Sequence, residues 1–193
     1  MKKIGLFIDL ANLWDSYKKI WKMIDFKKLI EFIEKEFWWH LEFKSVYFAY
    51  PKEWTRDYDI NWIHKFWTFL KKELWFHVKK KALKVIELRN SEGIILKDEN
   101  WKVITKEKWN LDIELTMDVM QTWHHFDTMV LFSWDSDFYC LVSFLQLKWK
   151  KVYVFSTQNN ISRELMHHSN KYYDYSKIEE IWGCKLKHRN EKS

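Results

Sequence analysis

Two aspartates lie two residues apart in VLFSWDSDFYCL, residues 130–141. The stretch predicts a buried strand, a tight turn that holds Asp135 and Asp137, and then a helix. Carboxylates a few ångströms apart repel one another unless a proton or a cation holds them, and oxygen ligands suit Mg²⁺ or Mn²⁺. Such ions can activate water and stabilise the leaving oxygen of a phosphodiester. The alternative is structural, because Asp135, Ser136 or Asp137 could simply cap the helix that begins near Phe138.

Two further aspartates are predicted to lie near this pair. Asp9 ends the hydrophobic run KKIGLFID at 2–9, and Asp112 stands in the first turn of a helix expected over 110–122. Strands that alternate with helices predict right-handed crossovers and a mostly parallel sheet, whose ligands sit at the carboxyl ends of the strands. We therefore expect all four carboxylates to converge on one edge of the sheet. Asp112 could equally serve the helix dipole, which favours acids in the first turn.

The hydrophobic periodicity predicts an α/β fold. The expected strands are 2–9, 41–51, 76–83, 128–133 and 151–157, with a further edge strand at 172–176. The expected helices are 23–37, 57–74, 110–122, 138–148 and 161–169, and Asp25 is the expected N-cap of the first. Residues 84–106 read as a polar hairpin excursion with a turn near 98–101. We expect one domain over residues 1–184 and a polar tail over 185–193.

The composition limits the kinds of partner and cellular location that we expect for this protein. The chain has 193 residues and a net charge of +6, a mild basic excess that favours polyanionic partners. It has no apolar run long enough for a transmembrane helix, and Asp9 interrupts the N-terminal apolar run before it can be a signal peptide. Cys140 and Cys184 lack metal-binding spacing. We therefore expect a reduced cytoplasmic protein without a membrane partner.

Tryptophan and glycine occur in unusual numbers, with 14 Trp against 3 Gly. Ordinary domains contain about 7% glycine. Trp101 lies in KDENWKVIT, a turn that favours glycine, and Trp38, Trp75 and Trp149 follow predicted helices where glycine commonly ends a helix. We interpret many of these tryptophans as glycines in the natural protein, because UGA is a codon that some genetic codes read as tryptophan and others as glycine. The alternative is a tryptophan-rich core.

Several segments together resemble the NYN domain family, the LabA-like members of the PIN-like nuclease superfamily. They are FIDLANL, KWNLDIELTMDVM, VLFSWDSDF, and KKVYVF followed by SREL and YYDYS, in that order along most of the chain. The family has glycine where Trp109 and Trp134 stand, which supports the glycine interpretation. Leu10 also departs from the pattern, at a position that is often glycine.

The resemblance implies a three-layer αβα sandwich of the PIN-like, Rossmann-like kind, and metal-dependent RNA cleavage. The implied catalytic residues and ligands of Mg²⁺ or Mn²⁺ are Asp9, Asp112, Asp135 and Asp137. Asn12 would support a ligand or touch phosphate, and Ser133 and Ser136 would contact phosphate or orient the carboxylates. Asp118 matches the helical acid of the second motif. A true tryptophan at position 134 would put activity in doubt, since it could obstruct the pocket.

We therefore expect a Mg²⁺- or Mn²⁺-dependent endoribonuclease that acts on single-stranded RNA, with self-association left open. The alternative is a non-catalytic RNA-binding or regulatory module of the same fold. A phosphohydrolase with Asp9 as nucleophile is a third reading, against which Ala11 counts, because that chemistry normally has a second acid at this position. The lysines at 79–81 and 84 either bind the RNA backbone or only solvate a strand end. The paired histidines at 124–125 and 167–168 are expected at the surface.

Overall fold

The computed structural model describes residues 2–13, 22–50, 60–108 and 111–185. A six-stranded sheet in the order β4-β3-β1-β7-β8-β9 forms its centre, and every pairing within it is parallel. The strands are β1 (Lys3–Asp9), β3 (His40–Tyr50), β4 (His77–Ala82), β7 (Thr128–Phe132), β8 (Lys151–Ser156) and β9 (Lys171–Asp174). The predicted α/β fold with a parallel sheet is confirmed, and the predicted edge strand near 172–176 is β9.

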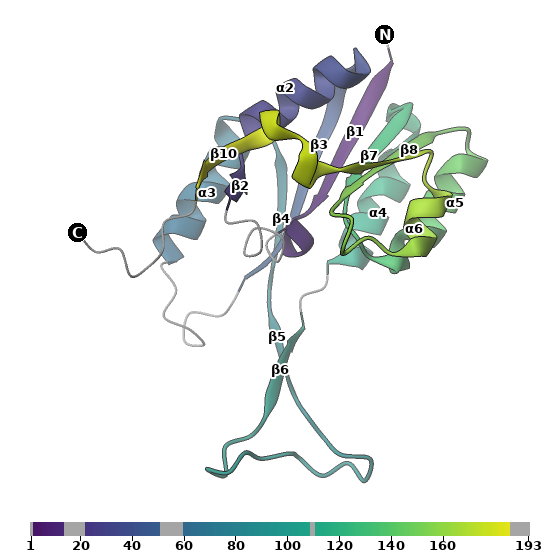
Figure 1. Cartoon of the computed structure of the whole chain (residues 1–193). Helices are drawn as coiled ribbons and strands as arrows, with labels where there is room; N and C mark the ends of the chain where they lie inside the picture. Colours follow the sequence, from purple (N-terminus) through teal and green to yellow (C-terminus); the bar gives the residue numbers. More distant parts are fainter. Residues whose placement is uncertain (1, 14–21, 51–59, 109–110, 186–193) are drawn as a thin grey trace.

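Helices cover both faces of this sheet (Figure 1). They are α2 (Phe26–Phe37), α3 (Ile60–Lys72), α4 (Asp112–Thr122), α5 (Tyr139–Leu147) and α6 (Arg163–His168). One apolar cluster joins α2 and α3 to one face of the sheet, and a second joins α4, α5 and α6 to the other face. The molecule therefore has the expected three layers.

The alternation of side chains along β1 shows why the strand belongs in the middle of the sandwich. Ile4, Leu6 and Ile8 point into the cluster with α2 and α3, whereas Phe7 points into the cluster with α4 and α5. Successive side chains of a strand point to opposite faces, so a strand covered on both faces needs an uninterrupted apolar run. The run KIGLFID meets this need and ends at Asp9, where the chain leaves the sheet.

Local capping signals were also read correctly for the first described helix. Asp25 is the N-cap of α2, and its side chain accepts hydrogen bonds from the backbone amides of Lys27 and Lys28 at 3.0 and 3.4 Å. A small antiparallel pair of strands was not foreseen. It joins β2 (Lys22–Ile24) to β10 (Trp182–Lys185) beside α2. Strands of three and four residues leave too little periodicity for detection in a sequence.

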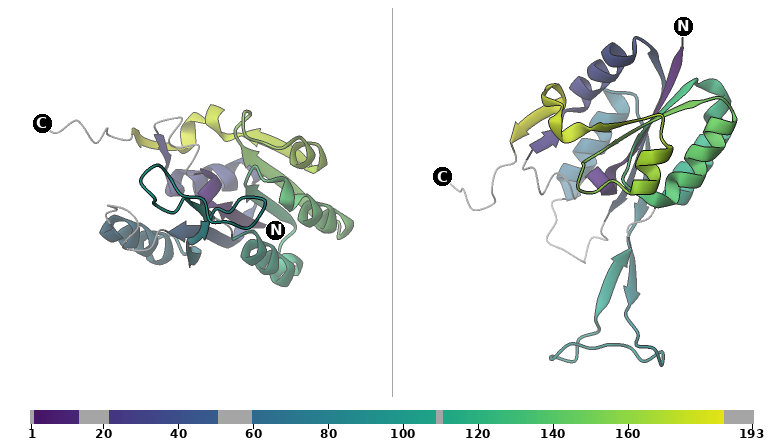
Figure 2. Two further views of the ribbon diagram at one scale, coloured as in Figure 1. Left: turned by 90° about the horizontal axis from the view of Figure 1, so that it is seen from below. Right: turned by 45° about the vertical axis from the view of Figure 1, so that its right-hand side comes forward.

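A hairpin arm projects from the body of the molecule (Figures 1 and 2). It begins with β5 (Lys84–Glu87), which pairs antiparallel with β6 (Thr105–Lys108) and with no other described strand. Between these strands lie two tight turns, one near 90–93 and one near 98–101. The arm leaves the body beyond the carboxyl end of β4 and returns just before α4, so its base lies at the carboxyl edge of the sheet.

No helix in the described ranges is both long and apolar enough to cross a membrane. The expected polar tail lies almost wholly outside the described residues, since β10 ends at Lys185.

Candidate metal centre

The sheet topology brings the ends of two motifs together. β1 and β7 are neighbours, and Ile8 pairs with Phe132 in their register. Asp9 and Ser133 follow these two residues, so the FIDLANL and SWDSDF motifs leave the sheet side by side. Adjacent parallel strands present their carboxyl ends at one edge, which is where such sheets bind ligands.

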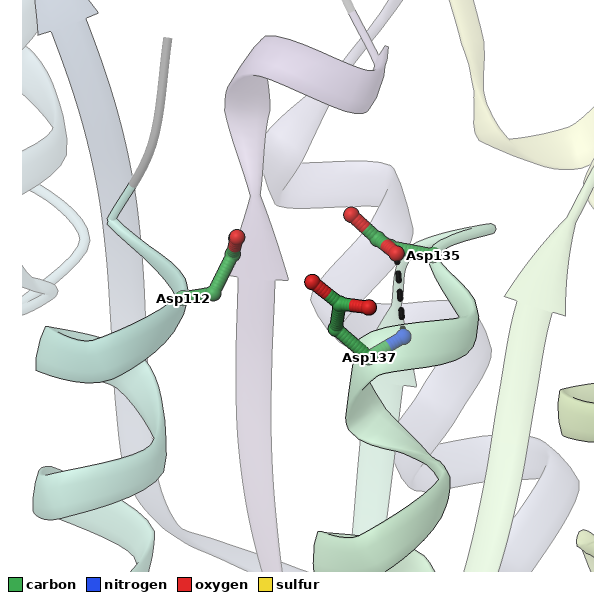
Figure 3. A group of neighbouring side chains, drawn as sticks. All are labelled: Asp112, Asp135 and Asp137. Atoms are coloured by element: carbon green, nitrogen blue, oxygen red, sulfur yellow. Dashed lines mark hydrogen bonds between the residues drawn. The ribbon is translucent and has the colours of Figure 1, made fainter.

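Three aspartates form the candidate centre at this edge (Figure 3). Asp112 projects from the first turn of α4, and Asp135 and Asp137 project from the segment that connects β7 to α5. One carboxylate oxygen from each lies within 4.8 Å of the others, and this is the one group of metal-binding geometry found in the described ranges. Asp112 and Asp135 are half-buried, whereas Asp137 is exposed. The structure thus brings together three of the four carboxylates expected from the sequence.

Asp135 also has a structural role. It is the N-cap of the short 3₁₀ helix η2 (Ser136–Phe138), and its Oδ1 accepts a hydrogen bond from the backbone amide of Asp137 at 3.0 Å. The capping alternative raised by the sequence is therefore correct for Asp135. It does not compete with metal binding, because a carboxylate has two oxygens and several lone pairs. Ser136 is exposed between the two aspartates.

Asn12 connects the ends of the two strands. Its side-chain amide donates to Asp9 Oδ2 at 2.6 Å and to Ser133 Oγ at 2.7 Å, and its backbone amide lies 3.4 Å from Asp9 Oδ1. Ser133 Oγ in turn accepts a hydrogen bond from the backbone amide of Asp135 at 3.2 Å. Asn12 and Ser133 thus orient the carboxylates, and the 3% exposure of Ser133 favours this role over direct contact with substrate.

Asp9 lies outside the group of three and is almost buried. The pKa of its carboxyl is raised from 3.8 to about 7, first by burial and then by the negative charges of Asp112 and Asp135. Backbone amides of Ala11 and Asn12 act in the opposite direction, because they stabilise the ionised form. The coupling to Asp112 and Asp135 shows that Asp9 belongs to the same electrostatic system. A bound cation would lower this pKa, since it would stabilise the ionised carboxylate.

Asp118, the helical acid of the second motif, is engaged elsewhere. Its Oδ2 accepts a hydrogen bond from Tyr47 Oη at 2.8 Å, and its Oδ1 lies 2.5 Å from Lys79 Nζ. These contacts tie α4 to β3 and β4. Asp118 is not part of the group of three aspartates.

The lysines of β4 are likewise engaged with the protein. Lys79 pairs with Asp118, Lys81 pairs with Glu114 of α4, and Lys80 Nζ lies 4.3 Å from the centre of the Trp67 ring. Of the two readings left open by the sequence, these contacts favour a structural role over RNA binding. The sequence carried no signal of this pairing, because it depends on which helix packs beside the strand.

The donor set of the centre fits a hard divalent cation. Asp112, Asp135 and Asp137 offer oxygen ligands only, and Mg²⁺ or Mn²⁺ commonly binds one or a few carboxylates while keeping several waters. Trp134 lies between Ser133 and Asp135, and its carbonyl accepts a hydrogen bond from the backbone amide of Ser162 at 3.1 Å. This bond fixes the aspartate-bearing loop against the start of α6.

Comparison with known proteins identifies the family and the fold of the chain. Residues 3–179 match the family model of the NYN domain. A stretch of 72 residues, 37% of this chain, is 38% identical to the low amplitude and bright protein LabA of Synechococcus elongatus, of which it covers only 39%. In three dimensions the chain is similar to a protein of unknown function from Vibrio parahaemolyticus, with a TM-score of 0.66, 18% identity, and coverage of 94% of this chain and 96% of the other. The structural likeness concerns the fold, and the family match extends over nearly the whole sequence. The chain belongs to the NYN domain family and has its PIN-like nuclease fold.

Proposed function

We propose that this protein is a metal-dependent ribonuclease that hydrolyses RNA phosphodiester bonds at the carboxyl edge of its sheet. The observation that carries the proposal is the convergence of Asp112, Asp135 and Asp137, with carboxylate oxygens within 4.8 Å of one another. Carboxylates held so close repel one another, and a bound cation would relieve that repulsion. Membership of the NYN domain family supports nuclease chemistry at this place.

The proposed role of each residue follows from the position of its side chain. Asp112, Asp135 and Asp137 would hold Mg²⁺ or Mn²⁺, and a bound divalent cation polarises a phosphodiester and increases the acidity of water. Asp9 is the fourth acid of the proposed site and interacts electrostatically with Asp112 and Asp135. Asn12 keeps the Asp9 carboxyl in one orientation through its 2.6 Å hydrogen bond. Ser136, exposed between two ligands, is placed to contact a phosphate oxygen.

Single-stranded RNA is the proposed substrate. The net charge of +6 favours a polyanion. The lysines at 79–81 are already engaged by α4 and Trp67, so we expect the phosphate contacts to come from other basic residues.

A non-catalytic RNA-binding or regulatory module is the second candidate, and Trp134 favours it. Its side chain is half-buried directly beside Asp135, where a bulky indole could restrict the approach of a phosphodiester. A phospho-enzyme route through Asp9 is disfavoured, because this residue is only 8% exposed and its carboxyl is hydrogen-bonded by Asn12.

Cleavage of end-labelled single-stranded RNA in the presence of Mn²⁺ tests the proposal. The assay compares the chain, its Trp134→Gly variant, and both with Asp135→Asn. Asparagine can still accept the capping hydrogen bond, so this change removes charge with little effect on the loop. Asp174→Asn is the matched control, because Asp174 lies at the carboxyl end of a strand of the same sheet and also caps a 3₁₀ turn. We expect cleavage that Asp135→Asn abolishes and Asp174→Asn preserves. Cleavage by none of the proteins, with RNA binding retained, would favour the non-catalytic module.

We also propose that two copies associate through the arm. Val85, Ile86 and Ile94 are exposed there, and a hairpin without a third strand or a packing partner is marginally stable in water. Residues 84–108 hold six basic and five acidic side chains, a mixture that suits another copy of the same arm better than a polyanion. Sedimentation of the chain with and without the arm tests this association.

A further inference from the structure

Four residues of the described chain adopt left-handed backbone without being glycine, and all four are tryptophan. They are Trp38, Trp75, Trp101 and Trp149, with φ values of 55°, 58°, 61° and 60°. A left-handed conformation is uncommon for any residue with a Cβ and is a true outlier for a bulky one. No other residue type shares this behaviour in the described ranges except Gly93. The coincidence of one rare residue with one rare conformation needs a common cause.

Two of the four residues end helices in the way that glycine does. Trp38 is the left-handed C-cap of α2. After α5, the amide of Trp149 donates to the carbonyl of Gln146 at 2.9 Å, and the amide of Lys150 donates to that of Leu145 at 3.0 Å. This pair of hydrogen bonds is the Schellman motif, in which the left-handed position is usually occupied by glycine. Trp149 occupies that position.

The arm contains an internal comparison between glycine and tryptophan. Asn90 Oδ1 accepts hydrogen bonds from the amides two and four residues later, at 3.0 and 2.9 Å, and Asp98 Oδ1 does the same with both distances 2.9 Å. The amide of the residue at the fourth position returns to the carbonyl of the first at 3.0 Å in both turns. That fourth residue is Gly93 with a φ of 83° in one turn and Trp101 in the other. The two turns have the same hydrogen-bond pattern, and the first of them has glycine at the left-handed position.

The indole groups gain nothing in return for the strained backbone. Trp38, Trp75, Trp101 and Trp149 are 85%, 80%, 80% and 95% exposed. Burial of an aromatic ring normally supplies most of what tryptophan contributes to stability. Lys97 lies over the Trp101 ring, but an exposed cation–π contact is a weak interaction. Stability therefore favours glycine over tryptophan at each of the four positions.

We infer that the natural protein carries glycine at positions 38, 75, 101 and 149, encoded by UGA codons that its cell reads as glycine. UGA is the one codon that different genetic codes assign to tryptophan and to glycine, so a single misreading accounts for all four residues. The totals of 14 Trp and 3 Gly agree with it. The inference concerns these four positions because their backbone demands it. Trp182 serves as a comparison, because its φ is negative, at −84°, and the residue is buried, with 6% exposure.

The inference bears on the proposed metal centre through Trp134. This residue does not have left-handed backbone, so the case for glycine there rests on its place in the SWDSDF motif. With the same codon at position 134, the natural loop would have no side chain between Ser133 and Asp135. Codons, peptide masses and unfolding temperatures do not depend on nuclease activity, so their outcome and that of the RNA cleavage assay can be told apart.

The gene and the natural protein provide the direct test. We expect UGA at the codons for positions 38, 75, 101 and 149. Mass spectrometry of peptides from the protein isolated from its own cells should then show glycine at these positions. UGG codons at the four positions, or peptides that contain tryptophan there, would overturn the inference.

Thermal unfolding provides a second test on the purified chain. Trp149→Gly and Trp101→Gly should unfold at a higher temperature than Trp149→Ala and Trp101→Ala, because alanine keeps the Cβ that the left-handed backbone disfavours. Trp182→Gly, the comparison, should lower the unfolding temperature. If glycine stabilises neither turn relative to alanine, the backbone argument fails and the inference with it.

Discussion

At the scale of single residues, Asp9 belongs to the acidic edge of the sheet although it lies outside the group of three aspartates. Asp9 is buried, hydrogen-bonded to Asn12, and close enough to Asp112 and Asp135 for their charges to raise its pKa. Without a cation, the negative charges of Asp112 and Asp135 oppose the ionisation of Asp9. Repulsion between negative charges therefore destabilises the metal-free site, and protons or a metal ion can relieve this repulsion.

The free energy of unfolding of the metal-free protein should fall as pH rises from the unfolded-state pKa of Asp9 to its folded-state pKa. The pKa of Asp9 is 3.8 in its ordinary state and about 7 in the fold. Between these values the folded chain binds more protons than the unfolded chain, so the free energy of unfolding decreases with increasing pH. Urea unfolding in EDTA at a series of pH values measures this slope. Asp9→Asn should flatten it, and an unchanged slope in that variant would refute the assignment to Asp9.

A divalent cation should stabilise the fold through the same site. Binding to the folded state alone contributes about 2.7 kcal/mol at a ligand concentration of 100 times the dissociation constant. We expect Mn²⁺ or Mg²⁺ to raise the unfolding temperature of the chain. Asp112→Asn should remove most of this shift, whereas Asp98→Asn in the arm should preserve it. Equal shifts in both variants would show that the ion binds elsewhere.

At the scale of elements, α4 is placed by its contacts with the sheet. Asp118 accepts from Tyr47 and Lys79, and Glu114 pairs with Lys81, so two turns of the helix are attached to β3 and β4. Asp112 begins the same helix. The position of one proposed metal ligand therefore depends on contacts made two and six residues further along the same helix.

Loss of the Asp118 contacts should destabilise the protein. Asp118 has a side chain only 15% exposed, and hydrogen bonds to charged groups contribute about 1.5–3 kcal/mol. We expect Asp118→Asn to lower the free energy of unfolding by an amount of this order, as measured in urea. Glu87→Gln, which removes an exposed ion pair with Arg89 on the arm, should change it by less than about 1 kcal/mol. Similar effects of both changes would mean that the contacts of Asp118 contribute little.

The sequence predicted the elements that have a strong hydrophobic pattern or a clear capping residue. The run before Asp9 gave β1, and Asp25 marked the start of α2, because buried strands and N-caps have local signatures. Asp112, Asp135 and Asp137 could be grouped in advance because parallel strands end at a common edge. The role of Asp118 could not, since its partners lie 39 and 71 residues away and pair with it only in the folded molecule. The short strands β2 and β10 were missed for the same reason, as each depends on the other.

At the scale of the whole molecule, the body and the arm are distinct. The body holds two apolar clusters, one on each side of the sheet, whereas β5 and β6 pair with no described strand except each other. Leu83 and Leu111, at the two ends of the arm, are buried in the body. The arm is thus attached at two anchored points and contributes little to the core.

Removal of the arm should leave the body folded. We expect a chain in which a short glycine-rich turn replaces residues 85–107 to unfold within a few degrees of the parent, because the anchors Leu83 and Leu111 are kept. Circular dichroism during heating measures this, and sedimentation of the same variant should show loss of self-association. Collapse of the body without the arm would mean that the arm supports the core.

The open edge of the sheet carries one more consequence. Among the described strands β4 pairs with β3 alone, and its KKK segment presents Lys80 and Lys81 to solvent. An unpaired edge strand is a template for aggregation, and charged side chains on it discourage the addition of a strand from another chain. Lys81, which attaches α4, and its neighbour Lys80 therefore also discourage the growth of fibres by edge-to-edge pairing. Any change that neutralises them to study α4 would expose this hazard at the same time.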